Sequence, residues 1–327
     1  MPADEAPVTA PPPDVVARVA ALRHRLDAAI PAKQVDRNLL VATWNVRAFG
    51  GLTKKWESGP DDSPKRNFAD VRAIAEIVSR FDVVALQEVR GDLRALRHLL
   101  KALGPDWGVI MSDVTETRAG NNERLAFVFD TRRMKPSGLA GEFAEPFDPD
   151  TGELVRALPR QFARTPYAVS FVSGSTTVVL VTLHVLWGPL ADERIGELRA
   201  IASRLADFAR EVENWGHGII ALGDFNIDRN GDPLYEAFTG TGLTPAPGLD
   251  DVPRTIFEGG ASDTSHFYDQ IAWFVDETRG PLLPVTCTAA GGVDFVTDLQ
   301  GALTREELSF HISDHYPLWA EFALPRP

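Results

Sequence analysis

Cysteine is nearly absent from this chain of 327 residues, since Cys287 is the single example. One cysteine excludes an intrachain disulfide and is typical of a reducing compartment. Long apolar runs are missing as well, because none approaches the roughly 18 residues that a membrane-spanning helix needs. The first residues are acidic and lack the basic and apolar stretches of a signal peptide. We therefore expect a cytoplasmic protein that has no membrane segment.

Basic residues are in deficit, with 33 Lys and Arg against 46 Asp and Glu, which gives a net charge of −13. This balance argues against a protein that coats nucleic acid with its whole surface, but not against an enzyme with a local basic face. Hydrophobic residues make up 44% of the chain, enough for a sizeable core. The length allows two domains, although large sandwich folds often form one.

We predict a boundary between residues 1–38 and a main domain of residues 39–327. Residues 1–13 are rich in proline and alanine, a composition typical of disorder. A helix with its N-cap at Asp14 is expected to follow, to end at Pro31 and to pack on the main domain as an appendage. In the main domain, strands first alternate with helices and then cluster. That order predicts two packed sheets with helices on both outer faces.

A buried strand that ends in polar residues is predicted at residues 219–227. The apolar run 219–222 is too short for a helix and precedes Gly223-Asp224-Phe225-Asn226. In an extended chain, Asp224 and Asn226 lie on one side and Phe225 lies on the other. A turn is the competing interpretation, because Asp and Asn favour turns. Polar groups at a buried strand end are costly unless they have partners or a ligand.

Similar polar residues stand at other predicted strand ends. Each has an ordinary explanation by itself: a turn for Asn45, an ion pair with Arg90 for Glu88, and a buried, hydrogen-bonded imidazole for His184. Six such positions in one chain favour a functional site instead. The positions are Asn45, Glu88, His184, Asp224 with Asn226, Asp269, and the segment Ser313-Asp314-His315 before the last strand.

These motifs resemble, in order along the chain, those of the endonuclease/exonuclease/phosphatase superfamily, and most of all its deoxyribonuclease I branch. The matching segments are Trp44-Asn45-Val46-Arg47, Gln87-Glu88-Val89-Arg90, Asn122-Glu123-Arg124, Phe162-Ala163-Arg164-Thr165-Pro166, Leu183-His184, Gly223-Asp224-Phe225-Asn226, Tyr268-Asp269-Gln270-Ile271 and Ser313-Asp314-His315-Tyr316-Pro317. The resemblance implies an α/β fold of four layers, an α/β/β/α sandwich. It also implies a metal-dependent phosphodiesterase, with a DNA endonuclease as the leading hypothesis.

The resemblance implies a metal site formed by Asn45, Glu88 and Asp314. Their oxygen atoms are hard ligands of the kind that Mg²⁺ prefers, and Mn²⁺ is the alternative ion. Asp224 is expected to align or deprotonate the attacking water, and the Asn226 amide to donate to a phosphoryl oxygen.

Two histidines are expected to move protons, because His184 and His315 titrate near neutral pH. By resemblance, Glu123 supports His184 and Asp269 supports His315. Arg47, Arg90 and Arg164 are the expected contacts to substrate phosphates. The alternative for Arg47 and Arg90 is surface ion pairing with acids such as Asp92, which would contribute little.

The chain departs from the deoxyribonuclease I branch in two respects. That branch is secreted and disulfide-bonded, whereas this sequence shows neither a signal peptide nor cysteine pairs, and Asn121 or Asn122 replaces a tyrosine that stacks in the minor groove. Two other functions therefore remain as alternatives. One is a small-molecule or lipid phosphoesterase of the same superfamily, similar to sphingomyelinases or inositol phosphatases. The other is a binding protein on a decayed nuclease scaffold, which the complete set of polar residues argues against.

Overall fold

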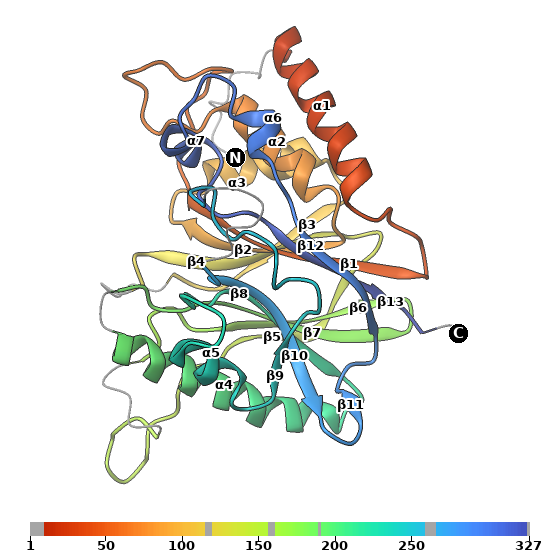
Figure 1. The fold of residues 1–327 in the computed structure, drawn as a ribbon, viewed down its shortest axis with the longest axis vertical. Coiled ribbons are helices and arrows are strands. Elements are labelled where there is room, and N and C mark those ends of the chain that lie inside the picture. The colour runs from red at the N-terminus through yellow and green to blue at the C-terminus, as the bar shows by residue number, and fades with distance from the viewer. Residues whose placement is uncertain (1–9, 115–119, 156–160, 189–190, 259–265, 326–327) are drawn as a thin grey trace.

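The computed structural model describes residues 10–114, 120–155, 161–188, 191–258 and 266–325. Two mixed β-sheets pack face to face, and a layer of helices covers the outer face of each (Figure 1). The predicted four-layer α/β/β/α sandwich is therefore confirmed. Most of the segment predicted to be disordered, residues 1–9, lies outside the described residues.

The first sheet has the strand order β12-β13-β1-β2-β4-β3. Only β1 and β2 pair in parallel, and the other neighbours are antiparallel. Both faces of β1 are covered, so its sequence is a nearly continuous apolar run rather than an alternating one. The bounds are β1 Asn38–Phe49, β2 Val83–Arg90, β3 Trp107–Met111, β4 Glu123–Asp130, β12 Thr286–Gly292 and β13 Leu318–Ala323.

The second sheet has the order β11-β10-β8-β7-β6-β5, and the short β9 pairs with β10. Here β7 and β8 are the parallel pair. A core of side chains from both sheets, including Val41, Phe127, Leu180 and Leu222, fills the space between them. The bounds are β5 Lys135–Glu142, β6 Tyr167–Ser173, β7 Thr176–His184, β8 Gly218–Asp224, β9 Leu243–Pro245, β10 Asp269–Asp276 and β11 Gly280–Pro281.

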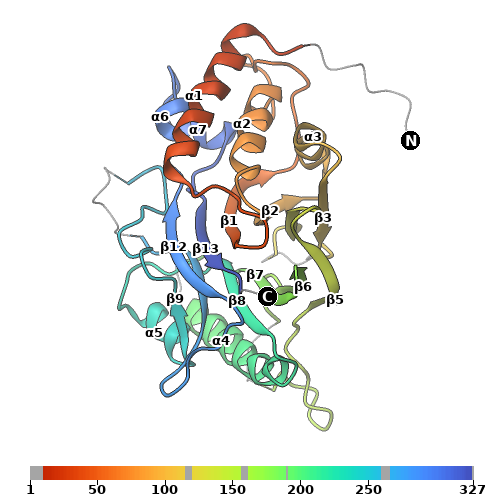
Figure 2. The ribbon, with the colours of Figure 1, turned by 90° about the vertical axis from the view of Figure 1, so that its right-hand side faces the viewer.

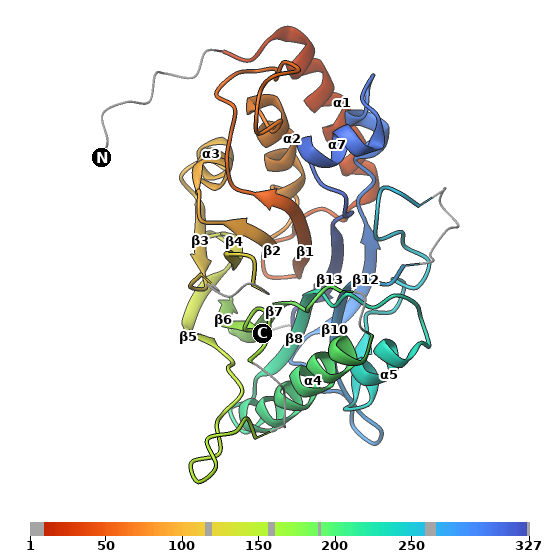
Figure 3. The ribbon, with the colours of Figure 1, turned by 90° about the vertical axis from the view of Figure 1, so that its left-hand side faces the viewer.

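The helices divide between the two outer faces (Figures 2 and 3). The first sheet is covered by α1 Pro13–Ala29, α2 Phe68–Val78, α3 Arg94–Leu103, α6 Val296–Leu299 and α7 Arg305–His311, and the second by α4 Ala191–Glu213 and α5 Pro233–Thr239. Side-chain caps fix several starts, among them Asn67 for α2, Asp232 for α5 and Thr304 for α7. Among the described residues, no helix has both the length and the apolar composition needed to cross a bilayer.

The N-terminal helix begins two residues earlier than predicted. Pro12 is the N-cap of α1 and Pro13 is its first residue, while Asp14 lies in the first turn. Proline suits this position because its missing N–H is not needed there. The apolar side of α1 packs on the main domain: Leu22 and Leu26 join the core beneath the helices. The division between residues 1–38 and 39–327 stays a prediction.

The least predictable elements lie near the C-terminus. The sequence predicts a strand at Leu282–Thr288, but β12 runs from Thr286 to Gly292. The short helices α6 and α7 have no counterpart in the predicted elements. The end of β12 is built from alanine and glycine, which are weak strand formers. A side chain at Gly291 would lie 2.9 Å from the ring of Trp319, so packing against β13 requires the glycine.

Candidate active site

The polar strand ends predicted from the sequence meet at one edge of the sandwich. Asn45, Glu88, His184 and Asp224 lie at or near the carboxyl ends of β1, β2, β7 and β8. Parallel strands present their carboxyl ends at the same edge, and β1–β2 and β7–β8 are the two parallel pairs. The Asn45 amide Nδ2 donates to Asp224 Oδ2 over 3.0 Å, which ties the two sheets together at this edge.

The Asp224 segment combines a strand end with a turn. Gly223 has φ +147°, and a Cβ there would lie 2.0 Å from the Leu183 carbonyl oxygen, so only glycine fits beside β7. Phe225 is buried in the core beneath α4 and α5, as predicted. Asn226 has φ +50°, so the chain is no longer extended there, and both sequence interpretations hold in part. Its N–H donates to Asp224 Oδ1 over 2.9 Å.

Asp224 lies between two imidazoles. Its Oδ2 is 3.6 Å from His184 Nε2 and 4.0 Å from His315 Nε2. Burial would raise the pKa of Asp224, but His184, His315, the Asn226 N–H and the Asn45 amide lower it below its ordinary value. A buried carboxylate is thus kept ionised inside a ring of donors.

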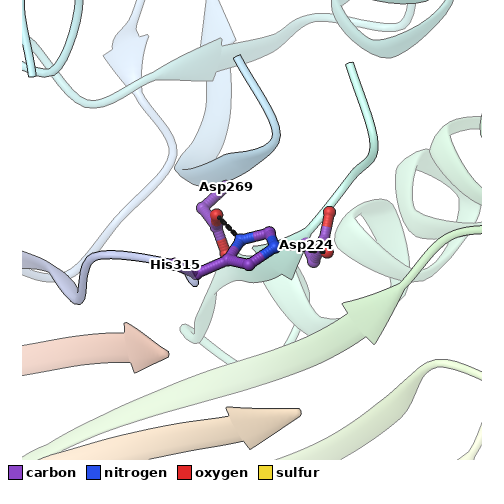
Figure 4. A group of neighbouring side chains, drawn as sticks. All are labelled: Asp224, Asp269 and His315. Carbon is purple, nitrogen blue, oxygen red and sulfur yellow. Dashed lines mark hydrogen bonds and ion pairs between the residues drawn. The ribbon is translucent and has the colours of Figure 1, made fainter. Parts of the chain in front are cut away.

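His315 is held between two aspartates (Figure 4). Its Nδ1 lies 2.6 Å from Asp269 Oδ2, and its other ring nitrogen faces Asp224. Burial would lower the pKa of His315, but Asp269, Asp224 and Asp314 raise it well above its usual value. The predicted pairing of His315 with Asp269 is present in the structure. Donor atoms of Asp224, Asp269 and His315 lie within 4.8 Å of one another, but a protonated imidazole repels a cation.

The second imidazole has a looser carboxylate partner. His184 Nδ1 lies 3.3 Å from Glu123 Oε2, outside hydrogen-bond alignment. Burial would raise the pKa of Glu123, but His184 and Arg164 lower it to about 2. Arg164 donates to Oε2 of Glu123, and Asn121 Nδ2 donates to Oε1 over 2.9 Å. Glu123 is therefore an ionised carboxylate with four polar or charged neighbours, and Arg90 is the fourth. Arg90 Nη2 lies 3.2 Å from Glu123 Oε1.

The predicted metal ligands have the donor chemistry that Mg²⁺ requires. Asn45 is 1% exposed, and its Oδ1 accepts no hydrogen bond from the described residues. Glu88 and Asp314 keep 19% and 27% of their side chains exposed, so their oxygens can reach a solvated ion. Glu88 has φ +60° at a register shift in β2, and its Oε2 accepts from the Ala48 N–H over 2.8 Å. A buried carbonyl oxygen that lacks a partner among the described residues, with two accessible carboxylates on neighbouring segments, has the donor chemistry for a divalent cation.

The three predicted phosphate-binding arginines differ in accessibility. Arg47 and Arg90 have side chains 31% and 27% exposed, whereas Arg164 is only 9% exposed and pairs with Glu123. Arg90 Nη2 lies 3.4 Å from Glu88 Oε2, and Arg47 Nη1 lies 3.7 Å from Asp314 Oδ2. Both arginines thus flank the carboxylates of the predicted metal site.

The alternative of a peripheral ion pair with Asp92 does not match the structure. Arg94 takes that carboxylate instead, at 2.6 Å from Asp92 Oδ2.

Sequence analysis missed two buried arginines that hold the site loops. Arg66 is 2% exposed and donates to the carbonyls of Arg47 (2.7 Å), Ala48 (3.1 Å), His311 (3.1 Å) and Ile312 (2.9 Å). Arg254 is fully buried and donates to the Asp269 carbonyl over 3.0 Å. Burial lowers the pKa of each to about 10. No local pattern distinguishes Arg66 from a surface arginine, because its partners include the distant carbonyls of His311 and Ile312. Arg254 also donates to the nearby carbonyls of Leu249 and Val252.

Comparisons with known proteins agree with this geometry. The model of the endonuclease/exonuclease/phosphatase family matches residues 42–315. Deoxyribonuclease-1 of Sus scrofa is 28% identical over 312 residues, which cover 92% of this chain and 97% of the relative. A deoxyribonuclease of Thioalkalivibrio sp. is 24% identical over 303 residues, covering 87% and 71%.

Solved structures share the fold at low identity. A mannosyl-6-phosphatase of Bacteroides thetaiotaomicron superposes with a TM-score of 0.60 at 19% identity, covering 87% of this chain and 99% of that one. Humanized D. rerio TDP2 gives 0.53 at 16% identity, covering 87% and 98%.

Proposed function

Because the chain belongs to the endonuclease/exonuclease/phosphatase family and is a phosphoesterase, we propose that it is an Mg²⁺-dependent endonuclease that cleaves phosphodiester bonds in DNA. The relatives named deoxyribonuclease support DNA as the substrate. The observation that carries the proposal is the buried, ionised Asp224, which lies between His184 and His315 and accepts from Asn45. This arrangement can activate a water molecule next to two proton-carrying groups.

Asp224 orients the attacking water and accepts its proton. A carboxylate with a lowered pKa is a weak base, so its main contribution is to hold the water in line, and the proton can pass to a neighbouring imidazole. Asn226 Nδ2 already donates to the Val185 carbonyl over 2.8 Å, which fixes the amide at the strand end. Its second N–H remains for a phosphoryl oxygen, where a preorganised donor stabilises developing charge.

His315 is the stronger candidate for the group that carries a proton to the substrate. Asp269 holds its Nδ1, which leaves Nε2 to face the reacting atoms, and its raised pKa keeps it protonated at neutral pH. His184 lies on the other side of Asp224, where its imidazole can donate to a nonbridging phosphate oxygen.

Asn45, Glu88 and Asp314 would hold the metal ion, which when bound offsets negative charge on the phosphate. Arg47 and Arg90 add positive charge beside these ligands, at a rim that the substrate backbone can reach. An acidic protein with such a local basic rim attracts phosphates only near the site.

The test is an activity panel on the purified protein with Mg²⁺. Supercoiled plasmid, single-stranded DNA, RNA, sphingomyelin vesicles and bis(4-nitrophenyl) phosphate are offered in parallel, with Asp224→Asn as the inactive control. We expect plasmid nicking and diester hydrolysis that excess chelator abolishes and Mg²⁺ or Mn²⁺ restores. Full activity in chelator contradicts the metal site. Activity on sphingomyelin vesicles or on the small diester without DNA cleavage favours the alternative phosphoesterase.

A further inference from the structure

Three exposed aromatic side chains lie on segments that adjoin the candidate site. Phe310 is 46% exposed, Phe257 53% and Trp187 71%. A single exposed aromatic residue needs no explanation. These three, however, lie on separate segments that all end at the catalytic edge, and the proposed chemistry does not use them.

Phe310 lies directly beside the predicted metal ligands. Its ring covers the Arg47 guanidinium, with 4.1 Å between the guanidinium carbon and the ring centroid. Arg47 Nη1 in turn contacts Ser309 Oγ at 2.5 Å and lies 3.7 Å from Asp314 Oδ2. The ring and the cation form one flat surface next to Asp314.

Phe257 is tied to the same place by backbone pairing. The Ile256 N–H donates to the Asp314 carbonyl over 2.9 Å, and Thr255 pairs with His315. Arg305, the first residue of α7, donates to the carbonyls of Ile256 and Glu258, the two neighbours of Phe257. Phe257 and Phe310 therefore lie on two segments that are fastened to each other.

Trp187 lies on the segment that follows the second sheet's strand β7, three residues beyond His184. The chain just before it is anchored, because the Val185 carbonyl accepts from Asn226 Nδ2 and the Leu186 N–H donates to Glu197 over 2.9 Å. The aromatic residues thus lie on segments connected to both sheets, since Trp187 follows β7 and Phe257 and Phe310 are fastened to the segment before β13.

We propose that Phe310, Phe257 and Trp187 form stacking platforms for unpaired nucleobases on either side of the cleaved phosphodiester bond. This inference rests on the proposed nuclease function and refines its substrate class. Aromatic rings bind any base through its π-face, and arginine beneath a ring adds phosphate affinity. In a closed duplex the base faces are already stacked, so single-stranded or locally unpaired DNA is the preferred substrate.

A lipid surface fits these rings less well. Phe310 already stacks on Arg47, a charged group that membrane insertion would have to desolvate.

The experiment combines enzyme variants with changes in the substrate. Single-stranded oligonucleotides carry an abasic analogue at each position next to the cleaved bond, and kcat/KM is measured for the wild type, Phe310→Leu, Phe257→Leu and Trp187→Leu. Removing a stacked base should cost the wild type roughly 5- to 100-fold. In the variant that lacks the ring stacked on that base, removing the base should not lower kcat/KM any further, because the two changes remove the same interaction.

Trp215→Leu is the matched control. Trp215 is 52% exposed but precedes the start of β8, about 20 Å along the strand from Asp224. Hydrolysis of bis(4-nitrophenyl) phosphate should stay within about twofold in all four variants, because the small diester does not extend to the rim.

The possible outcomes distinguish a failure of the stacking proposal from a failure of the proposed nuclease function. Cleavage of single-stranded and duplex DNA at equal rates, with additive losses in every cycle, overturns the platform and leaves the nuclease intact. The stacking proposal is also overturned if the ring variants lose as much activity on bis(4-nitrophenyl) phosphate as on the oligonucleotides, because the rings then only support the fold of the site. Diester hydrolysis without cleavage of any nucleic acid overturns the proposed function itself. Hydrolysis of sphingomyelin vesicles that depends on the three rings would mean that the rings bind lipid instead of nucleobases.

Discussion

At the scale of single residues, the site places carboxylates and imidazoles in alternation. Asp269, His315, Asp224 and His184 follow one another, with 2.6, 4.0 and 3.6 Å between neighbouring donor and acceptor atoms. Each carboxylate favours the charged form of the adjacent imidazole, and each imidazole favours the charged form of the carboxylate. A change at one member therefore alters the protonation of the others.

Asp224→Asn and Asn226→Ala test the two residues at the strand end. We expect kcat to fall by a factor on the order of 10² or more in each, because one change removes the water-orienting carboxylate and the other a preorganised donor. Steady-state kinetics on plasmid and on the small diester measure the effect, with thermal unfolding as the control for folding. Near-normal kcat in a folded variant would place the chemistry elsewhere.

The pH profile tests the pairing of His315 with Asp269. A proton donor works below its pKa, and the raised pKa of His315 extends its protonated form to higher pH. Asp269→Asn removes the largest attraction, so the alkaline fall in kcat should move to lower pH by about 1–3 pH units. Glu123→Gln should leave this limb in place, since Glu123 contacts His184 instead. An equal shift in both variants contradicts separate pairing.

At the scale of elements, buried polar side chains fix the conformation of the loops that follow the strands at the site. The Ser313 hydroxyl donates to the Asn45 carbonyl over 2.6 Å, and Arg66 joins the loop after β1 to the segment before Asp314. Arg66 also binds the carbonyl of Ala48, whose N–H donates to Glu88. One side chain thus supports the segments of two predicted metal ligands.

Arg66→Met should therefore raise the Mg²⁺ concentration for half-maximal activity by on the order of 10-fold, as loss of an outer support of a metal site does. Arg254→Met is the matched control, because Arg254 is equally buried but supports the Asp269 segment. Both variants should unfold at lower temperature, and only the first should change the Mg²⁺ requirement. A similar increase in the Mg²⁺ requirement of both variants would mean that Arg66 has only a general structural role.

At the scale of the whole molecule, function depends on a local departure from the overall charge. The chain carries −13, yet Arg47 and Arg90 border the catalytic edge. Repulsion between an acidic protein and DNA makes each phosphate contact at this rim more important, and the contact is sensitive to salt.

Replacing Arg90 with alanine tests this rim. If Arg90 contacts a phosphate, the slope of log kcat/KM for DNA against log salt should weaken by about 0.9. Activity on bis(4-nitrophenyl) phosphate should fall as well, because Arg90 also contacts Glu88 and Glu123. Arg94→Ala, four residues away and paired with Asp92, should leave both unchanged. An unaltered slope in Arg90→Ala would remove the phosphate contact from the proposal.

The sequence by itself determined the long helices, most of the buried strands and the chemistry at the strand ends. Short apolar runs followed by Asn45, Glu88, His184 and Asp224 were sufficient, because burial and strand geometry act within a few residues. The cap residue of α1 and the bounds of β12 were missed, since these depend on proline geometry and on the close packing of Gly291 with Trp319.

Only the tertiary structure decided which distant residues meet. The hydrogen bond from Asn45 to Asp224 joins two sheets across 179 positions, and Arg66 reaches carbonyls up to 246 positions away. The same holds for the exposure of Phe257 and Phe310, since aromatic residues in a sequence are expected to be buried. Contacts between residues this far apart follow from how the layers pack, and packing is a property of the whole chain.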